Sequence, residues 1–373
     1  MEREELAAWL RLALTEGVGN TAARRLLAAF GLPQDILAAA SDALEQVVSP
    51  AQARALLDIP PGFDEQLQLT WDWLAQGGGR RILTLADSGY PQGLLETADP
   101  PLMLYLMGNP HCDWPAAIAM VGSRNPTPQG LANARQFARS FVQAGLTVVS
   151  GMATGVDGAA HEGALEGAAP GQLATIAVVG TGLDRVYPRK HLDLAHRIAQ
   201  QGWIASEYPL GTPPLAENFP RRNRIIAALS QGTLVVEAAL QSGSLITARQ
   251  ASEQGKDVFA IPGSIHSAQA RGCHWLLKQG AKLVETAQDV LEELRPGLAA
   301  NAPVQAAIDF PAPATDRDAS LLEALGFDPV SLDALVARTG MAAPELQARL
   351  LELELDGRVS RLPGGLFQQC GAA

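Results

Sequence analysis

A chain of 373 residues, of which 47% are hydrophobic, is long enough for two or three domains with a substantial core. Its formal net charge of −11 excludes a uniformly basic coat for nucleic acid but leaves room for a local basic site. The acidic start of the chain is not a signal peptide and no uncharged apolar run has transmembrane length, so we expect a cytoplasmic protein without a membrane partner.

The charge is distributed unevenly along the chain. Residues 1–75 carry 5 basic and 11 acidic side chains, and residues 319–373 carry 4 and 7, whereas residues 76–296 carry 18 of each. A phosphate-binding surface is therefore expected in the central region. The three cysteines are far apart and follow no metal-binding spacing, so we expect neither disulfides nor a metal, and the sequence indicates no cofactor.

Residues 1–75 are predicted to form a helical domain of the helix-hairpin-helix or SAM-like type. Within it, residues 16–27 have the pattern of a tight hairpin between two helices, in which Gly17 and Gly19 permit the turn. Such hairpins often present N–H groups to a DNA backbone, but they also occur as packing hairpins. We favour packing because Arg24 and Arg25 are too few to offset the six excess negative charges of this region.

Residues 76–296 alternate short apolar runs with longer helical patterns, which predicts a Rossmann-like, doubly wound, mostly parallel α/β sheet. Several of the runs are continuous in Val, Ile and Ala, as expected for parallel strands that are buried on both faces. The predicted strands are 117–121, 147–149, 175–179, 203–206, 234–236, 258–261 and 282–284.

Glycine-rich loops follow four of these strands, at residues 122–124, 150–155, 180–182 and 262–264. In open α/β sheets, loops at the carboxyl ends of strands line the ligand crevice. We expect these loops to converge there with residues 219–247.

Residues 219–247 indicate a polyanion as ligand. Three arginines and an asparagine open a predicted helix, and a Gly/Ser loop opens a second helix after a buried strand. Helix N-termini and arginine forks bind phosphate, and an aromatic ring can stack a base. The residues expected to contact phosphate or a base are Gly122, Ser123, Arg124, Gly151, Phe219, Arg221, Arg222, Asn223, Arg224, Ser242, Gly243, Ser244 and Thr247.

Several of these residues allow two interpretations. Of Arg222 and Arg224, one is expected to bind phosphate while the other pairs with a carboxylate such as Glu237. Phe219 could stack a base or pack in the core. Asn223 could hydrogen-bond a phosphate or cap its helix.

Asp157 and His161 are four residues apart on a predicted helix, a spacing that could suggest acid–base chemistry. A capping role for Asp157 and a structural hydrogen bond for His161 explain the pair equally well. We favour the structural interpretation because no third group or metal cluster accompanies them.

Residues 297–318 are predicted to be a linker, and residues 319–373 a winged-helix domain. Its second helix would be the recognition helix, yet Glu345, Glu352 and Glu354 outnumber Arg349 there. Because phosphate neutralisation drives nonspecific DNA affinity, this copy is expected to bind protein or to be structural.

Residues 80–296 contain a dense, ordered series of short motifs. They lie at residues 90–91, 99–105, 121–124, 150–157 with His161, 180–184, 187–188, 206–207, 219–224, 242–247 and 262–263. Their order and spacing resemble the DNA-processing protein A family (DprA, also called Smf). A helical leader and a winged-helix tail also occur in many members. One departure is His191, which stands where the family often has Asn after Tyr-Pro.

The resemblance implies a single-stranded-DNA-binding protein of natural transformation, which protects incoming DNA and loads the RecA recombinase onto it. It implies a homodimer formed by the α/β core, and no catalytic reaction is established for the family. The sequence does not locate the interface. Apolar helix faces around Leu276, Leu277, Leu291 and Leu294 are candidates for it, or for internal packing.

Two other classes of function fit parts of the sequence. A dinucleotide-dependent oxidoreductase would use residues 180–182, which supply only the first two glycines of the fingerprint. A nucleotide-phosphate-binding hydrolase on a related Rossmann-like fold would use the loop 242–247, with Glu207 or Glu237 as the base.

Overall fold

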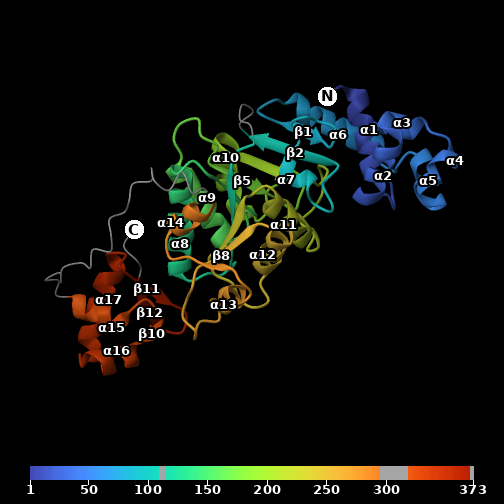
Figure 1. Cartoon of the computed structure of the whole chain (residues 1–373). Helices are drawn as coiled ribbons and strands as arrows, with labels where there is room; N and C mark the ends of the chain where they lie inside the picture. Colours follow the sequence, from blue (N-terminus) through green and yellow to red (C-terminus); the bar gives the residue numbers. More distant parts are fainter. Residues whose placement is uncertain (109–113, 295–317, 370–373) are drawn as a thin grey trace.

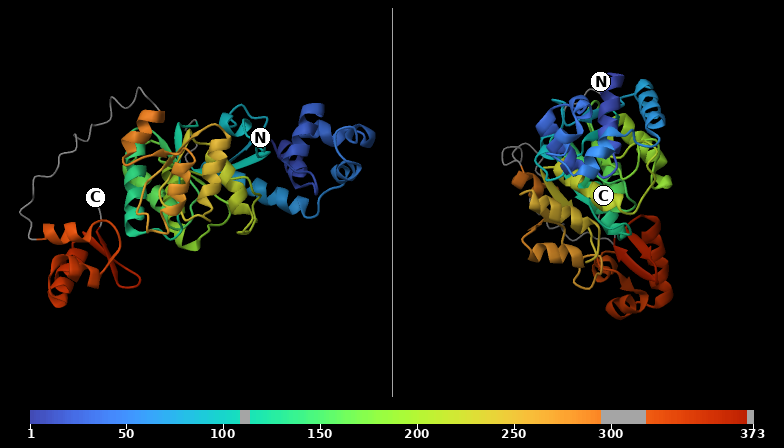
Figure 2. Two further views of the ribbon diagram at one scale, coloured as in Figure 1. Left: turned by 60° about the horizontal axis from the view of Figure 1, so that its bottom comes forward. Right: turned by 90° about the vertical axis from the view of Figure 1, so that its right-hand side faces the viewer.

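The structure is a computed structural model that describes residues 1–108, 114–294 and 318–369. These residues form a helical N-terminal part, a central α/β part and a small C-terminal part (Figure 1). Figure 2 shows the N-terminal helices against one end of the central sheet.

The N-terminal part consists of helices that pack around buried apolar side chains, and its hairpin is a packing element. Val18 in the hairpin is buried, and the carbonyl of Gly17 accepts a hydrogen bond of 2.7 Å from Gln52. These contacts fit the packing role that we favoured over a DNA contact. The helices are α1 (Arg3–Leu14), α2 (Asn20–Phe30), α3 (Pro33–Ala38), α4 (Ser41–Leu44), α5 (Pro50–Leu57) and α6 (Phe63–Ala75).

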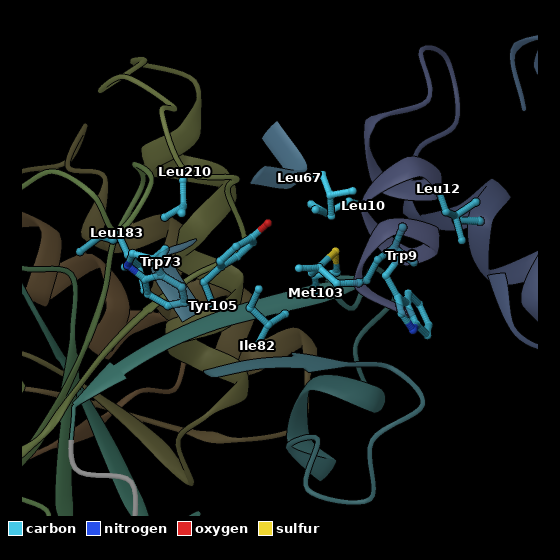
Figure 3. Close-up of a cluster of buried hydrophobic side chains, with 14 of the residues drawn as sticks. Trp9, Leu10, Leu12, Leu67, Trp73, Ile82, Met103, Tyr105, Leu183 and Leu210 are labelled. Atoms are coloured by element: carbon cyan, nitrogen blue, oxygen red, sulfur yellow. The ribbon is translucent and has the colours of Figure 1, made fainter. Parts of the chain in front are cut away.

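The apolar core continues from the N-terminal helices into the central part. Figure 3 shows this cluster, in which Leu10 and Leu67 of the N-terminal part lie near Met103 and Tyr105. The same cluster reaches Leu210 in the loops of the central part. Burial of this continuous apolar surface fixes the helices to the edge of the sheet.

The central part is built on a nine-stranded sheet with the order β1-β2-β6-β5-β4-β3-β7-β8-β9. Strands β3 to β9 pair in parallel, whereas β1 and β2 form an antiparallel edge next to β6. The doubly wound, mostly parallel fold is confirmed. The strands are β1 (Arg81–Thr84), β2 (Met103–Gly108), β3 (Ala117–Val121), β4 (Thr147–Ser150), β5 (Thr175–Val178), β6 (Trp203–Ser206), β7 (Gly232–Val235), β8 (Asp257–Ala260) and β9 (Lys282–Leu283).

Helices cover both faces of this sheet, which explains the continuous apolar runs. Ile118 and Met120 of β3 pack with α8, α9 and α14, whereas Ala119 and Val121 face α11 and α12. The helices are α7 (Gln92–Leu95), α8 (Pro128–Gln143), α9 (Val156–Gly167), α10 (Leu192–Gln201), α11 (Asn218–Ala228), α12 (Ser244–Glu253), α13 (Arg271–Lys278) and α14 (Ala287–Leu294), with a 3₁₀ turn η1 (Arg189–His191).

The leucines proposed for a dimer interface lie in this internal packing. Leu276 of α13 and Leu291 of α14 are buried in the two core layers, and Leu277 and Leu294 pack against them. The alternative of internal packing is therefore correct for these four residues.

The chain reverses its direction of travel across the sheet between β3 and β7. From β3 it adds β4, β5 and β6 on one side, and it then returns to place β7 on the other side. The crevice at such a reversal, outside the carboxyl ends of the strands, is where open α/β sheets bind ligands. The loops after β3 and β7 are joined there by a hydrogen bond of 2.7 Å from Ser123 N to the carbonyl of Glu237.

The C-terminal part is a winged helix, as predicted. Leu335, Leu350 and Phe367 belong to its separate apolar core. Its elements are α15 (Ala319–Leu325), β10 (Val330–Ser331), α16 (Leu332–Thr339), α17 (Ala343–Leu355), β11 (Val359–Leu362) and β12 (Leu366–Gln369), with the strand order β10-β12-β11.

Candidate nucleic-acid interface

The loop after β3 carries Arg124 on a rigid base. The carbonyl of Ser123 accepts from Val156 N at 3.1 Å, and the carbonyl of Arg124 accepts from Thr154 Oγ1 at 3.1 Å. Gly155 has φ +83°, and a Cβ there would lie 2.3 Å from the Ser123 carbonyl oxygen, so this approach requires glycine. The Arg124 side chain is exposed, while its backbone is held by α9.

Arg124 lies beside the ring of Phe219, which in turn lies beside the ring of Tyr187. Its guanidinium carbon is 5.9 Å from the ring centroid of Phe219, and that ring is 5.5 Å from the ring of Tyr187. Tyr187 is 49% exposed and Phe219 is half-buried. A cation next to exposed rings is the arrangement on which unpaired bases stack, and we call these three residues the stacking surface. Phe219 is thus partly exposed at the surface and partly packed against neighbouring residues.

Tyr187 was not among the site residues predicted from the sequence. Its signal was the Tyr-Pro dipeptide at 187–188, which was used only as a family motif. The pairing of its ring with Phe219, 32 residues further along the chain, follows from the fold and has no local signature.

Arg222 differs from the prediction, because it points into the protein. Its side chain is buried, and Nη1 donates to the carbonyls of Gly151, at 2.7 Å, and of Val178. A Cβ on Gly151 would lie 2.5 Å from Nη2, so Gly151 provides room for this guanidinium. Burial lowers the pKa of Arg222 to about 10, opposed by Asp157. Arg222 and Gly151 therefore form an internal clamp on the ends of β4 and β5 and do not face a ligand.

Arg224 is also engaged, but with a different carboxylate from the one expected. Its Nη2 forms a close ion pair with Glu207 and lies 3.6 Å from Asp99. The side chains of Arg224 and Glu207 are only 15% and 12% exposed. Burial raises the pKa of Glu207, and the neighbouring Arg224 opposes that rise.

Glu237 is a structural carboxylate. It accepts hydrogen bonds from the backbone N–H and the hydroxyl of Thr127, at 2.9 and 2.6 Å, and Thr127 in turn caps α8. Burial raises its pKa, and the two Thr127 hydrogen bonds oppose that rise. The hydrolase interpretation needs Glu207 or Glu237 as a free base, and both carboxylates are occupied by protein groups.

The loop before α12 lies beside the start of α11. Asn223 Nδ2 donates to the carbonyl of Gly243 at 3.3 Å, so it joins the two elements and does not cap its own helix. Ser242 and Ser244 share a hydrogen bond of 2.6 Å between their hydroxyls. Ser244 and Thr247 are buried, whereas Gly243 is exposed. Gly243 and Ser242 are thus the parts of this loop that a ligand can reach.

Asp157 and His161 are both structural, but Asp157 does not cap α9 as expected, because Gly155 is the N-cap residue. His161 is fully buried, and its Nδ1 lies 2.7 Å from Thr175 Oγ1, which donates to the carbonyl of Val148 at 2.6 Å. Burial lowers the pKa of His161 to about 3, so the ring is neutral and donates from Nδ1. Asp157 accepts from Ala153 N at 3.3 Å, and burial raises its pKa.

The predicted residues therefore separate into three groups. Arg124 and Arg221 present charge to solvent, Phe219 contacts Arg124, and Asn223 is hydrogen-bonded to Gly243, which follows Ser242. Gly122 and Ser123 shape the loop beneath Arg124, and the remaining residues of the prediction are internal. The exposed cations Arg189 and Lys190 follow Tyr187 and were not predicted.

Within the described residues, no group of three or more His, Cys, Asp or Glu side chains is arranged to hold a metal ion. Nor does the described part of the chain include a helix that is both long and apolar enough to cross a membrane.

The fold and the interface define a Rossmann-like α/β protein with a cationic, aromatic surface at the carboxyl edge of its sheet. Residues 81–295 match the DNA recombination-mediator protein A family, and residues 305–365 match the DprA winged helix domain. The chain belongs to the DNA recombination-mediator protein A family.

Relatives and solved structures agree with this assignment. Protein Smf of Escherichia coli is 42% identical over 324 residues, which cover 84% of this chain and 83% of that protein. The crystal structure of DNA processing protein A from Streptococcus pneumoniae is similar with a TM-score of 0.65 and 36% identity, over 79% of this chain and 98% of that one. DNA processing protein A from Helicobacter pylori, described with its single-stranded DNA binding mode, has a TM-score of 0.51 and 32% identity. The match covers 57% of this chain and 95% of that one.

Proposed function

We propose that this protein binds single-stranded DNA on the stacking surface. The observation that carries the proposal is the contact of the exposed Arg124 with Phe219, which in turn contacts the exposed Tyr187. Rings stack bases without regard to sequence, and Arg124 supplies a cation for the backbone. The single-stranded DNA binding described for the Helicobacter pylori relative supports the same ligand.

The exposed cations indicate a path for the strand. Arg221 begins the second turn of α11, two residues from Phe219, and the exposed Gly243 lies beside Asn223 of the same helix. Arg189 and Lys190, which are exposed and follow Tyr187 closely in the sequence, add further positive charge. A strand several nucleotides long that crosses the stacking surface would therefore have cations besides Arg124 to meet.

In the cell, we propose, the protein acts in natural transformation, where it protects the incoming strand and loads RecA recombinase onto it. Membership of the family supports this role. Homodimerisation through the α/β core belongs to the same proposal. It is supported by exposed apolar side chains on α12, on α13 and in the loops beside them, namely Leu240, Ile246, Ile265 and Trp275.

The test is fluorescence anisotropy with labelled oligo-dT and a duplex of equal length across a salt series. The native protein is expected to prefer the single strand, and Tyr187→Ala is expected to weaken binding by about 1–3 kcal/mol because one stacking ring is lost. Arg54→Ala, which removes an exposed arginine of the N-terminal part, is the matched control for loss of a surface side chain. Unchanged affinity in Tyr187→Ala and Arg124→Ala would place the DNA elsewhere.

A further inference from the structure

An open cavity of about 720 Å³ lies between the N-terminal helices and the central part, and its lining includes no residue of the stacking surface. One wall is α2, with Leu27 and Ala28, and the other is formed by Leu85, Leu95 and Pro100 from the loops after β1 and around α7. We call it the interdomain groove. Its volume lies in the range of about 300–1,000 Å³ that is typical of ligand sites. Most of its lining is apolar, so an occupant must bring an apolar group of its own.

A buried hydrogen-bond donor lines the groove without an acceptor. The side chain of Trp9 is only 1% exposed, and its Nε1 has no partner among the described residues. Figure 3 shows the indole ring projecting from α1 with its nitrogen on the side away from Leu12. A buried N–H without an acceptor costs free energy. A carbonyl or carboxylate oxygen of an occupant that reached Nε1 through a shift of the indole ring would remove that cost.

Two arginines on α2 give the groove its charge. Arg24 donates to the carbonyl of Ala98 at 2.8 Å, which holds the loop after α7 in place. Arg25 is exposed, and within the described residues no carboxylate or carbonyl engages its guanidinium. The groove thus combines apolar walls, one unsatisfied donor and a free cation.

This combination fits a peptide better than a nucleic acid. A nucleobase carries several polar atoms, which the apolar walls would leave without partners. A nucleic acid brings a phosphate with every nucleotide, and the groove offers only Arg24 and Arg25 to neutralise them. Two guanidiniums can instead neutralise one or two carboxylates. A peptide also supplies backbone carbonyls at every residue for the Trp9 donor.

We propose that the interdomain groove is a docking site for an acidic segment of a partner protein, which inserts one large apolar side chain. Leu32 and Leu95, which are 50% and 41% exposed at the groove, would be covered by the inserted side chain. The carboxylates of the segment would lie against Arg25. This proposal does not depend on single-stranded DNA binding, because the groove and the stacking surface share no residue.

The test uses full-length protein and three fluorescein-labelled peptides in anisotropy titrations. They are Gly-Glu-Asp-Phe-Leu-Asp-Gly, the same peptide with lysine for each acid, and the same peptide with serine for Phe and Leu. Only the first should bind, and its affinity should fall at least about tenfold in Arg25→Glu and in Ala28→Trp, which fills the groove. Arg54→Glu and Ala29→Trp, on exposed helix positions that do not line the groove, are matched controls and should bind the peptide normally.

A second readout reports on Trp9 directly. The indole ¹⁵N–¹H signal of Trp9, assigned by its loss in Trp9→Phe, should shift with the acidic peptide and not with oligo-dT. Single-stranded DNA affinity should be unchanged in every variant, which also shows that Ala28→Trp has folded. Equal binding of the lysine peptide, full binding by Ala28→Trp, competition by oligo-dT, or no binding of the acidic peptide at millimolar concentration would each overturn the proposal.

Discussion

Two exposed arginines at the candidate interface are expected to bind DNA phosphates through their positive charge. Arg124→Ala and Arg221→Ala should each weaken single-stranded DNA binding and reduce the slope of log affinity against log salt by about 0.7, because each removes one phosphate contact and its released counterion. The measurement is oligo-dT anisotropy between low and physiological salt, with Arg54→Ala as control. Slopes equal to that of the native protein in both variants would show that neither arginine meets a phosphate.

Arg224 is expected to stabilise the folded protein, although it is only three residues from Arg221, which is expected to bind DNA. Its ion pair with Glu207 is largely buried, so Arg224→Ala leaves a carboxylate without its partner. We expect a loss of roughly 3 kcal/mol in the free energy of unfolding, measured by urea denaturation. Adding Glu207→Gln should recover most of that loss, because the unpaired charge is gone. A double variant no more stable than Arg224→Ala would contradict this account.

His161 gives the protein a defined sensitivity to acid. Its folded pKa of about 3 lies below the ordinary value of 6.5, so the unfolded chain binds a proton more readily than the folded chain between these values. Stability contributed by neutral His161 is therefore complete above pH 6.5 and falls as the pH drops toward 3, by on the order of 3 kcal/mol at pH 4.

The variant that tests this is His161→Asn, which keeps a nitrogen donor for Thr175 but does not titrate. Its unfolding free energy should depend less on pH between 6.5 and 4 than that of the native protein. His196→Asn changes an exposed histidine of α10 and should leave the dependence intact. Parallel curves for native protein and His161→Asn would show that another group is responsible.

The sequence located the arginines of the site but not their directions. Arg221, Arg222 and Arg224 are neighbours on one helix, yet one faces solvent, one clamps β4 and β5, and one pairs with Glu207. All three are the same residue type, and all three lie within four consecutive positions of the sequence. Only the angular position on α11 relative to the sheet separates them, and that position depends on contacts with distant segments.

At the scale of elements, the buried parallel strands were predictable because they carry an unbroken apolar signal. All seven predicted strands are present, with ends within two residues of those expected. The antiparallel edge strands β1 and β2 were missed. β1 has only two apolar residues, Ile82 and Leu83, between Arg81 and Thr84, and β2 pairs with β6 on its other side, an arrangement that local periodicity does not reveal.

The winged helix is expected to add little to single-stranded DNA affinity. Its α17 exposes Leu351, Leu355 and Glu352, where a DNA-reading helix would present cations. Removing residues 319–373, which have a net charge of 4 − 7 = −3, should leave most of the oligo-dT affinity. In the full-length protein, Arg361→Ala on β11 should likewise bind DNA normally. A loss of binding in both variants, with circular dichroism showing a folded core, would assign the winged helix a DNA contact.

At the scale of the whole molecule, one stacking surface is short compared with a long DNA strand. Three side chains contact only a few nucleotides, whereas two linked copies bind the same strand with a gain in effective concentration. The surface that we propose for a second copy is formed by the exposed apolar residues of α12, α13 and the adjoining loops. Ile265 is 76% exposed and Trp275 is 39% exposed, and burial of such side chains favours a symmetric dimer.

We therefore predict that Ile265→Asp makes the protein monomeric and removes the gain in affinity with strand length, because a buried aspartate at the interface would lack a partner. Light scattering gives the mass, and titration with oligo-dT of increasing length gives the affinity of each variant. Ile59→Asp, at a position that is 65% exposed on the N-terminal part, should remain dimeric and retain the gain. Short oligonucleotides should bind both variants equally, since each stacking surface is intact. A native protein that is monomeric at micromolar concentration, or an Ile265→Asp variant that still gains affinity with length, would show that a single copy holds the strand.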